Sequence, residues 1–524
     1  MFSPGRAKTM QIEKEVSTER MTDGLVLAKG GAVTGLAYLA SLFRAIFTIL
    51  VAWTLGATAL GTLALAWSLA DLLSKLGTFG LDTTVLILTA RQRELGDVAG
   101  AAEVLKKSIA WGLLLSGAVA FLGIAGLQLF GSTFGQSGEL ARASSVMLLA
   151  LPGIALYRIS NGASRGMWQP QHDFYSHGLT ETFSTIAMFA VVLGLGFGAL
   201  APIVATLSAC WASGLVAFYL ALSVFRSGPR TGAVPGQSRK LLAASFPVAL
   251  NNLLIILMQR MNILLLGALV GRVPGLTLGT LGIYAAAFEL SNLFRKLQQS
   301  FGPMFTPVIA AAVAHDDRPR MERAFGQLAR WMLAAQLPFL ALFIVSGGLI
   351  LCSYGPDYRI GAVWLALLGL ANVLGTFAAL AGSTMVAVRP SSNLLTSLLA
   401  LPPQLVLTLL LVRWAGPTGA ALAAMASYLL QSGIRYCEMK RVFRWECPWH
   451  DLAKPCAAFF AGLIPAAAIR LFWSGLVAEL TAGLIFLGLY FFAWRWLGMD
   501  EADRALLDQI LYKRRQNKSS ASSG

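Results

Sequence analysis

Long apolar runs recur along the whole chain and alternate with short polar segments. Most runs reach about 20 residues, the length that a helix needs to cross a hydrocarbon core about 30 Å thick. Backbone groups in lipid require internal hydrogen-bond partners, so each run is predicted to be a helix. The pattern predicts about fourteen spans of an all-α polytopic membrane protein, at residues 30–55, 59–80, 108–130, 143–163, 174–198, 202–225, 241–270, 279–300, 323–352, 361–387, 393–413, 417–438, 455–474 and 478–497.

Composition supports a membrane protein. Hydrophobic residues make up 56% of the chain and charged residues 13%, with a mean hydropathy of +0.67, well above the usual apolar share of a water-soluble domain. Residues 1–29 are polar with mixed charge, and the first apolar run is too long for a signal sequence. We therefore expect no cleavable signal, and the first span should remain in the mature protein.

The distribution of basic residues explains the net charge of +16. With the N-terminus inside, most Lys and Arg fall on cytoplasmic segments, as the positive-inside rule requires. The few that fall outside are Arg142, Arg272, Arg359, Arg413 and Arg470. The basic residues thus follow a membrane and not a nucleic acid, so we predict cytoplasmic termini, the cell inner membrane and no nucleic-acid partner.

The five cysteines and four histidines carry no recognisable chemistry. The cysteines have neither a C-x-x-C motif nor a partner spacing, so we expect no disulfide and no zinc site. The histidines fall in cytoplasmic loops or at helix ends, where a solvated side chain is the usual case. The sequence therefore predicts no metal and no cofactor.

The chain contains an internal repeat. The sequence Leu-Gly-Thr-Leu occurs at residues 60–63 and again at 278–281, each copy beginning eleven residues before an acid, Asp71 or Glu289. Further landmarks recur at nearly the same offset: Arg44 with Arg260, Trp111 with Trp331, Gly162 with Gly382, Pro170 with Pro390 and Pro202 with Pro417. A constant offset predicts two six-helix lobes related by a parallel pseudo-two-fold axis.

The repeat and a Gly/Pro-rich charged segment set the predicted domain boundaries. Lobes joined by such a linker can rock around a cleft, as alternating access requires. The predicted parts are a cytoplasmic N-terminal tail (1–29), an N-lobe (30–225), a cytoplasmic linker (226–240), a C-lobe (241–445), two additional spans (455–497) and a basic amphipathic cytoplasmic tail (498–524), suited to anionic lipid.

Arg44 and Arg260 are embedded in the first and seventh predicted spans, where an arginine at mid-bilayer costs about 2.5–3.5 kcal/mol on insertion scales. Arg44 in the first span shares a polar helix face with Tyr38 and Ser41, and Arg260 in the seventh lies beside a cluster that includes Asn252 and Gln259. Hydrogen bonds between helices would account for the amides. Two matched guanidiniums facing a cleft would instead suit an anion such as pyrophosphate.

Other charged residues in or beside the predicted spans each have two possible interpretations. Asp71 and Lys75 have the spacing of an intrahelical ion pair, whereas Glu289 lacks a cation four residues on; these three are the candidates for ion coupling. At the cytoplasmic end of the fourth span, the spacing of Arg158, Asn161 and Arg165 places them on one helix face. That face predicts a cationic cytoplasmic mouth, or else simple positive-inside anchoring.

The polar first helix with Arg44, the turn at residues 55–61, the Gly-Leu-Asp at 80–82 and the second copy of this arrangement resemble Wzx-type polysaccharide flippases. These belong to the multidrug/oligosaccharidyl-lipid/polysaccharide (MOP) exporter superfamily. The resemblance covers roughly residues 28–445. It implies a V-shaped pair of lobes around a cationic cavity that carries undecaprenyl-pyrophosphate-linked oligosaccharide, with Arg44 and Arg260 as cavity arginines. Membrane lipids, a polysaccharide polymerase and glycosyltransferases are the implied partners.

Three alternatives remain at this stage. The same superfamily includes lipid II flippases and drug exporters. The resemblance to drug exporters implies a cation site built from membrane carboxylates, whereas the first span here has Arg44 and no acid. A polytopic polysaccharide polymerase or ligase would be an enzyme on the same lipid carrier. Short external connections and the lack of a phosphate loop or metal-ligand cluster argue against an enzyme.

Overall fold

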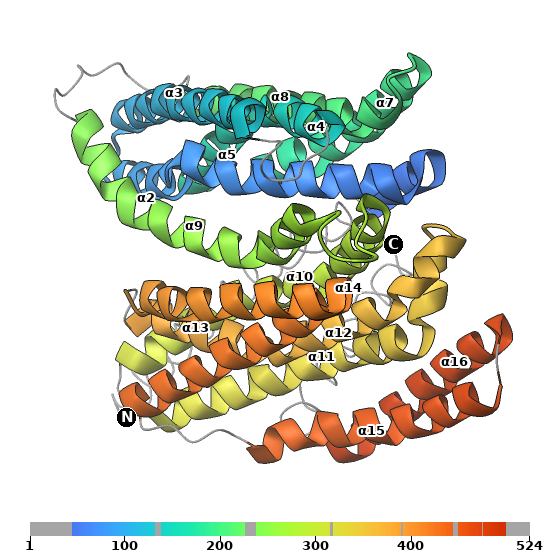
Figure 1. The fold of residues 1–524 in the computed structure, drawn as a ribbon. Coiled ribbons are helices and arrows are strands. Elements are labelled where there is room, and N and C mark those ends of the chain that lie inside the picture. Colours follow the sequence, from blue (N-terminus) through green and yellow to red (C-terminus); the bar gives the residue numbers. More distant parts are fainter. Residues whose placement is uncertain are drawn as a thin grey trace, which may run out of the picture. The chain divides into compact units, whose positions relative to one another are not determined.

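The computed structural model describes residues 45–130, 138–225, 237–314, 318–388, 391–443, 449–473 and 475–498. Within these ranges the regular elements are helices, with no strand (Figure 1). Ten of the helical segments are long and apolar enough to cross a membrane. The all-α membrane architecture is therefore confirmed, whereas the count of fourteen spans stays a prediction.

Two glycines break long helical segments. Gly56 has a φ of 77° within Ala45–Thr78, and Gly416 has a φ of 55° within α14 (Ser391–Phe443). An L side chain pays a steric cost in this region, whereas glycine does not. Both breaks fall where the hydropathy pattern predicts one span to end and the next to begin, so each segment holds parts of two predicted spans.

The chain divides into two compact units, the first formed by Met1–Leu290 and Ser391–Ser427. Within it α5 packs against α2, α3 and α8, and buried aliphatic residues fill the contacts. Its elements are Ala45–Thr78, α2 (Leu81–Glu94), α3 (Val98–Phe130), α4 (Gly138–Leu148), α5 (Leu151–Gly166), α6 (Gln171–Asp173), the π-helix η1 (Phe174–Thr180), α7 (Glu181–Gly194), η2 (Gly198–Leu200), α8 (Ala201–Phe225), α9 (Gln237–Leu269), the first part of α10 (Leu278–Ala314) and the first part of α14.

The repeated Leu-Gly-Thr-Leu segments pack against each other inside this first unit. A Cβ added to Gly61 would lie 2.0 Å from the Leu278 carbonyl oxygen, and one added to Gly282 would lie 1.9 Å from the Ala57 carbonyl oxygen. The backbones of Ala45–Thr78 and α10 therefore touch, an approach that small residues allow between membrane helices. The motif that revealed the repeat thus forms a helix crossing.

The second unit comprises Ser291–Pro390 and Tyr428–Gly524. Here α11 is central and packs against α12, α15 and α16, and a core of Met and Phe side chains joins α11 to α13 and the end of α14. Its elements are the end of α10, α11 (Arg318–Cys352), the 3-10 helix η3 (Pro356–Gly361), α12 (Ala362–Leu374), α13 (Thr376–Val388), the end of α14, α15 (Trp449–Phe472), α16 (Leu476–Ala493) and the π-helix η4 (Trp494–Gly498).

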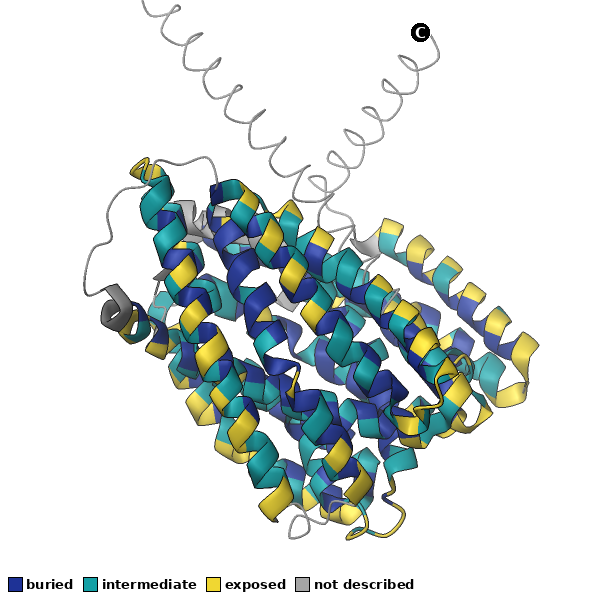
Figure 2. Cartoon of the chain, turned by 90° about the horizontal axis from the view of Figure 1, so that it is seen from above, coloured by how far each residue is buried: buried dark blue, intermediate teal, exposed yellow. Residues whose placement is uncertain are grey.

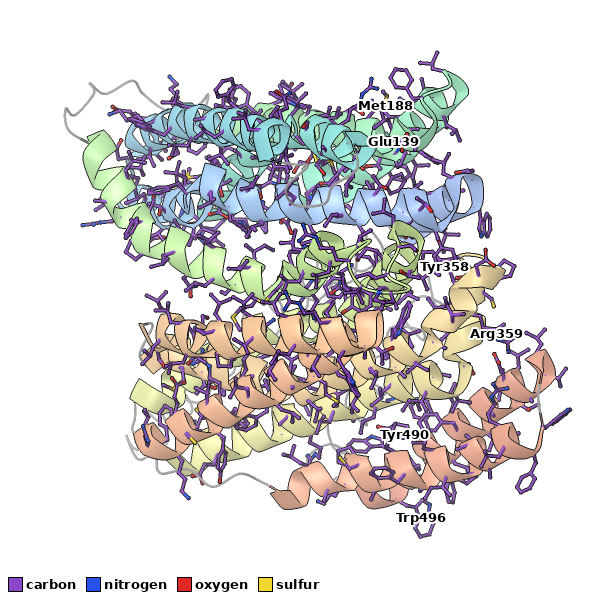
Figure 3. The ribbon with its side chains drawn as sticks, in the orientation of Figure 1. Glu139, Met188, Tyr358, Arg359, Tyr490 and Trp496 are labelled. Carbon is purple, nitrogen blue, oxygen red and sulfur yellow. The ribbon has the colours of Figure 1, made fainter. Side chains whose placement is uncertain are left out.

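Polar contacts hold α16 to η3, α15 and α11 within the second unit. Glu479 is buried; it accepts a hydrogen bond from Arg359 at 2.9 Å and forms an ion pair with Arg470 at 3.0 Å. The Tyr490 hydroxyl donates to the Ala334 carbonyl at 2.8 Å. Figure 3 shows Tyr490 pointing toward α11, opposite to the exposed Trp496.

Large apolar side chains remain exposed along the outer sides of these helices. Phe472 is 92% exposed and Leu471 is 84% exposed at the end of α15. Figure 2 shows buried and exposed positions alternating along the same helices. Helices of a water-soluble protein would hide such residues, so this surface is the one that lipid would cover.

Candidate functional site

A single buried carboxylate, that of Asp71, joins two arginines in the first unit. Arg158 of α5 donates from Nη2 to Asp71 Oδ1 at 2.9 Å. Arg260 of α9 donates to Asp71 Oδ2 from Nη2 at 2.9 Å and from Nε at 3.1 Å. The side chains are 8% exposed for Asp71, 14% for Arg158 and 11% for Arg260, so the three charges are almost fully removed from solvent.

Arg158 has further partners on both sides of its guanidinium. Its Nη1 donates to Ser74 Oγ at 3.0 Å, and its Nε donates to the Tyr157 hydroxyl at 3.3 Å. Neither partner is a carboxylate, so Asp71 is the shared acid of Arg158 and Arg260. The three side chains, called the Arg158–Asp71–Arg260 cluster below, carry one net positive charge.

The predicted ion pair between Asp71 and Lys75 is wrong. Lys75 Nζ instead lies 3.7 Å from the carboxylate of Asp82. Phe79 and Gly80, with positive φ of 48° and 71°, interrupt the helix between these two residues. Two guanidiniums with several donors each outcompete one ammonium for the Asp71 carboxylate, since charge-assisted forked contacts are stronger.

Two of the three residues on the predicted cytoplasmic face of α5 have partners inside the bundle, and the role of this face as a cationic mouth stays a prediction. Arg158 turns to Asp71, while Asn161 donates to Asp173 at 2.8 Å and accepts from Ser176 at 3.0 Å. Arg165 is exposed. Helical spacing placed the three side chains near one another, but neighbouring helices supply partners that hold the first two inside the bundle.

These contacts tie α5 to η1 through a polar network. His172, just before η1, shares a hydrogen bond of 3.1 Å with Ser164, and partial burial holds the pKa of His172 below its usual value. The π-helix η1 has an irregular backbone of the kind often found at functional positions. The predicted solvated role of the histidines therefore does not describe His172.

The polar cluster of α9 divides between two roles. Asn262 is buried and accepts a hydrogen bond from Thr408 of α14 at 3.3 Å, and Gln404 of α14 donates to the Met258 carbonyl at 2.8 Å. These bonds hold α14 to α9. Asn252 and Gln259 are half-buried and make no hydrogen bond within the described residues.

Three predicted cavity residues, Tyr38, Ser41 and Arg44, lie outside the described residues. Their assignment stays a prediction. The linker and both predicted tails also lie wholly or almost wholly outside the described ranges.

The first unit contains a cavity of about 90 Å³ that is lined by two carboxylates. Glu181 at the start of α7 and Glu289 of α10 line it together with Thr48, Thr182, Thr185, Thr206, Trp67 and six apolar residues. Glu181 is 5% exposed and contacts His177 of η1, whose ring stacks on Tyr157 at 5.0 Å. Sequence reasoning missed Glu181, although an acid inside the predicted span 174–198 was a usable signal.

Among the described residues, no group of three or more His, Cys, Asp or Glu side chains could hold a metal ion. The described residues hold two charged features, a cationic cluster around Asp71 and an acidic cavity around Glu181 and Glu289. Groups of both signs placed within membrane helices are typical of transport paths.

The fold is that of known transporters. A multidrug resistance MATE family transporter of the MOP superfamily in an inward-facing conformation matches with a TM-score of 0.67 and 17% identity, over 77% of this chain and 94% of that one. The lipid II flippase MurJ in an inward closed conformation matches at 0.65 and 12%, over 89% and 99%. A MOP superfamily transporter from Pyrococcus furiosus, described as having a binding pocket of reverse polarity, matches at 0.59 and 16%, over 80% and 95%.

No curated protein matches the sequence. The family model described as "Polysaccharide biosynthesis protein" matches residues 27–312, more than half of the chain. This match includes Asp71, Arg158, Arg260 and both cavity acids. The protein is a multi-pass membrane protein with the MOP superfamily fold, and it belongs to the polysaccharide biosynthesis protein family.

Proposed function

We propose that the protein is a flippase that carries an undecaprenyl-pyrophosphate-linked oligosaccharide from the cytoplasmic to the periplasmic leaflet of the inner membrane. The observation that carries the proposal is the buried Arg158–Asp71–Arg260 cluster with its net positive charge. Paired guanidiniums bind phosphate oxygens well, and the matched family model is described as a polysaccharide biosynthesis protein. Cargo would move by alternating access between two lobes (30–225 and 241–445).

The same proposal assigns roles to the other predicted site residues, to the termini and to the partners. Arg44 and Arg260 would contact the diphosphate, with Tyr38, Ser41, Asn252 and Gln259 beside them. Cytoplasmic termini agree with the placement of Lys and Arg along the chain. Membrane lipids surround the protein, and a polymerase and glycosyltransferases are the partners that would use or supply its cargo.

Depletion of the protein in cells tests this function. Radiolabelled lipid-linked oligosaccharide is expected to accumulate in the cytoplasmic leaflet, because the path across the membrane is lost. Normal translocation combined with altered polymer length would instead indicate a polymerase or ligase. Accumulation of lipid II would indicate a lipid II flippase.

A cation-coupled drug exporter is the second candidate, and the acidic cavity is the observation that favours it. Glu181 and Glu289 would attract a proton or a metal cation to a cavity whose other lining residues carry no charge. A cation could equally drive the flippase, so the cavity by itself does not choose between cargoes. Loss of drug resistance on deletion, with surface polysaccharide intact, would select the exporter.

A further inference from the structure

We propose that the Asp71 carboxylate occupies the place of the cargo's phosphate oxygens, and that an incoming diphosphate displaces it from Arg158 and Arg260. This inference rests on the proposed function, because it assumes a cargo that carries a diphosphate. It assigns Arg158 as a further phosphate ligand beside Arg44 and Arg260, and Asp71 as the carboxylate that holds Arg158 and Arg260 together in the structure.

The geometry of the cluster supports the exchange. The two oxygens of one carboxylate each contact a different guanidinium at 2.9 Å. The donors of Arg158 and Arg260 therefore converge on an oxyanion whose two oxygens are one carboxylate width apart. A phosphate group presents oxygen pairs of closely similar spacing, and forked guanidinium donors fit both anions.

The charges of the cluster favour a further anion. One carboxylate faces two guanidiniums, and buried charge of one sign is costly in a membrane unless it is neutralised. The nearby Lys75–Asp82 pair is neutral as a whole, so it adds no net charge. A diphosphate brings more negative charge than Asp71 does, so it neutralises the two arginines more completely than Asp71 can.

Displacement of Asp71 would also break a contact between residues of the two predicted lobes. Asp71 and Arg158 belong to the predicted N-lobe, whereas Arg260 belongs to the predicted C-lobe. A cargo that takes Arg260 from Asp71 replaces a contact within the protein by a contact to cargo. Cargo would then shift a conformational equilibrium through a difference in contacts, as such a shift requires.

Binding of a short lipid diphosphate to the full chain tests the exchange. The probe is geranylgeranyl pyrophosphate, titrated against purified protein in detergent, with the uncharged alcohol geranylgeraniol as its matched control. Asp71→Asn removes the competing carboxylate and is expected to tighten binding of the diphosphate at least about tenfold, the factor that corresponds to 1.4 kcal/mol. Binding of the alcohol should not change.

Asp82→Asn is the matched variant. It also removes one carboxylate from the same neighbourhood, but Asp82 is paired with Lys75 and is not a hydrogen-bond partner of either arginine. It should leave the affinity within about threefold of wild type, which is under 0.7 kcal/mol. Unchanged or weaker binding by Asp71→Asn, or equal tightening by Asp82→Asn, would overturn the exchange.

A second comparison covers the case in which Asp71→Asn does not fold, since it leaves two guanidiniums without their carboxylate. The double variant Asp71→Asn/Arg158→Gln has the same net charge in the cluster as wild type. It should bind geranylgeranyl pyrophosphate about tenfold more tightly than Arg158→Gln alone, which still has Asp71 opposing the probe. Equal affinity of these two variants would refute the proposal.

The result also separates this inference from the function on which it rests. If neither wild type nor the variants without Asp71 bind the diphosphate, the anionic cargo is wrong. If wild type binds the diphosphate and removal of Asp71 has no effect, the cargo assignment stands and the displacement alone fails.

Discussion

Arg260 donates two hydrogen bonds to one carboxylate oxygen of Asp71, a residue 189 positions earlier in the chain. Its counterpart in the sequence repeat, Arg44, lies in the first predicted span. The acid that the repeat pairs with Asp71, Glu289, lines a separate cavity. Equivalent positions of the two repeats therefore have different surroundings, one in an ionic cluster and the other in a cavity wall.

Removal of Arg260 is expected to abolish export. Arg260→Ala deletes one of the three guanidiniums that we propose as phosphate ligands, but Arg158 still neutralises Asp71, so the helix should insert normally. Arg44→Ala should have the same effect. Surface polysaccharide and protein level in the membrane fraction are the measurements. Arg413→Ala, at an exposed position, is the control and should export normally; normal polysaccharide in both test variants would remove these residues from the cargo site.

Asp71→Ala is expected to lower the free energy of unfolding by about 3–5 kcal/mol, because it leaves two buried guanidiniums without a carboxylate. Thermal unfolding of the purified chain in detergent measures the loss as a lower midpoint. Lys75→Gln makes the comparison, since Lys75 is not a partner of Asp71 and holds only the longer contact to Asp82. If Lys75→Gln destabilised the protein as much as Asp71→Ala, the assigned pairing would be incorrect.

The crossing of the repeated segments should tolerate no side chain. Gly282→Ala places a methyl group against the Ala57 carbonyl, where the backbone itself must move, so a cost of about 1–3 kcal/mol is expected. Gly61→Ala should behave in the same way. Gly117→Ala in α3 is the matched control, because an added Cβ has nothing within 4 Å and alanine favours a helix by about 1 kcal/mol. Equal stability of all three variants would contradict the close crossing.

The acidic cavity should be required for coupling to a cation gradient. Glu181→Gln is expected to remove the stimulation of lipid flipping by a proton or sodium gradient in proteoliposomes, because a neutral amide attracts cations poorly. Binding of geranylgeranyl pyrophosphate should not change. The exposed Glu139, labelled in Figure 3, provides the control variant Glu139→Gln. Persistent stimulation in Glu181→Gln would leave the cavity without a coupling role.

Sequence alone determined that this protein is a helical membrane protein with an internal repeat. The hydropathy of a span is a sum over consecutive residues, and helical hydrogen bonds connect residues four apart. Both properties therefore depend on local sequence. The breaks at Gly56 and Gly416 were predicted for the same reason. Arg260 could likewise be identified from the sequence, because it lies inside an apolar run.

Tertiary structure decided which charges meet. Asp71 bonds across 87 residues to Arg158 and across 189 to Arg260, and no spacing rule reaches that far. Local spacing favoured Lys75, which was wrong, because guanidiniums from α5 and α9 provide more hydrogen bonds than one ammonium on the same helix. Glu181 likewise gained its cavity only through helices distant in sequence. Local patterns determine where helices form, whereas the partners of a buried charge depend on how those helices pack.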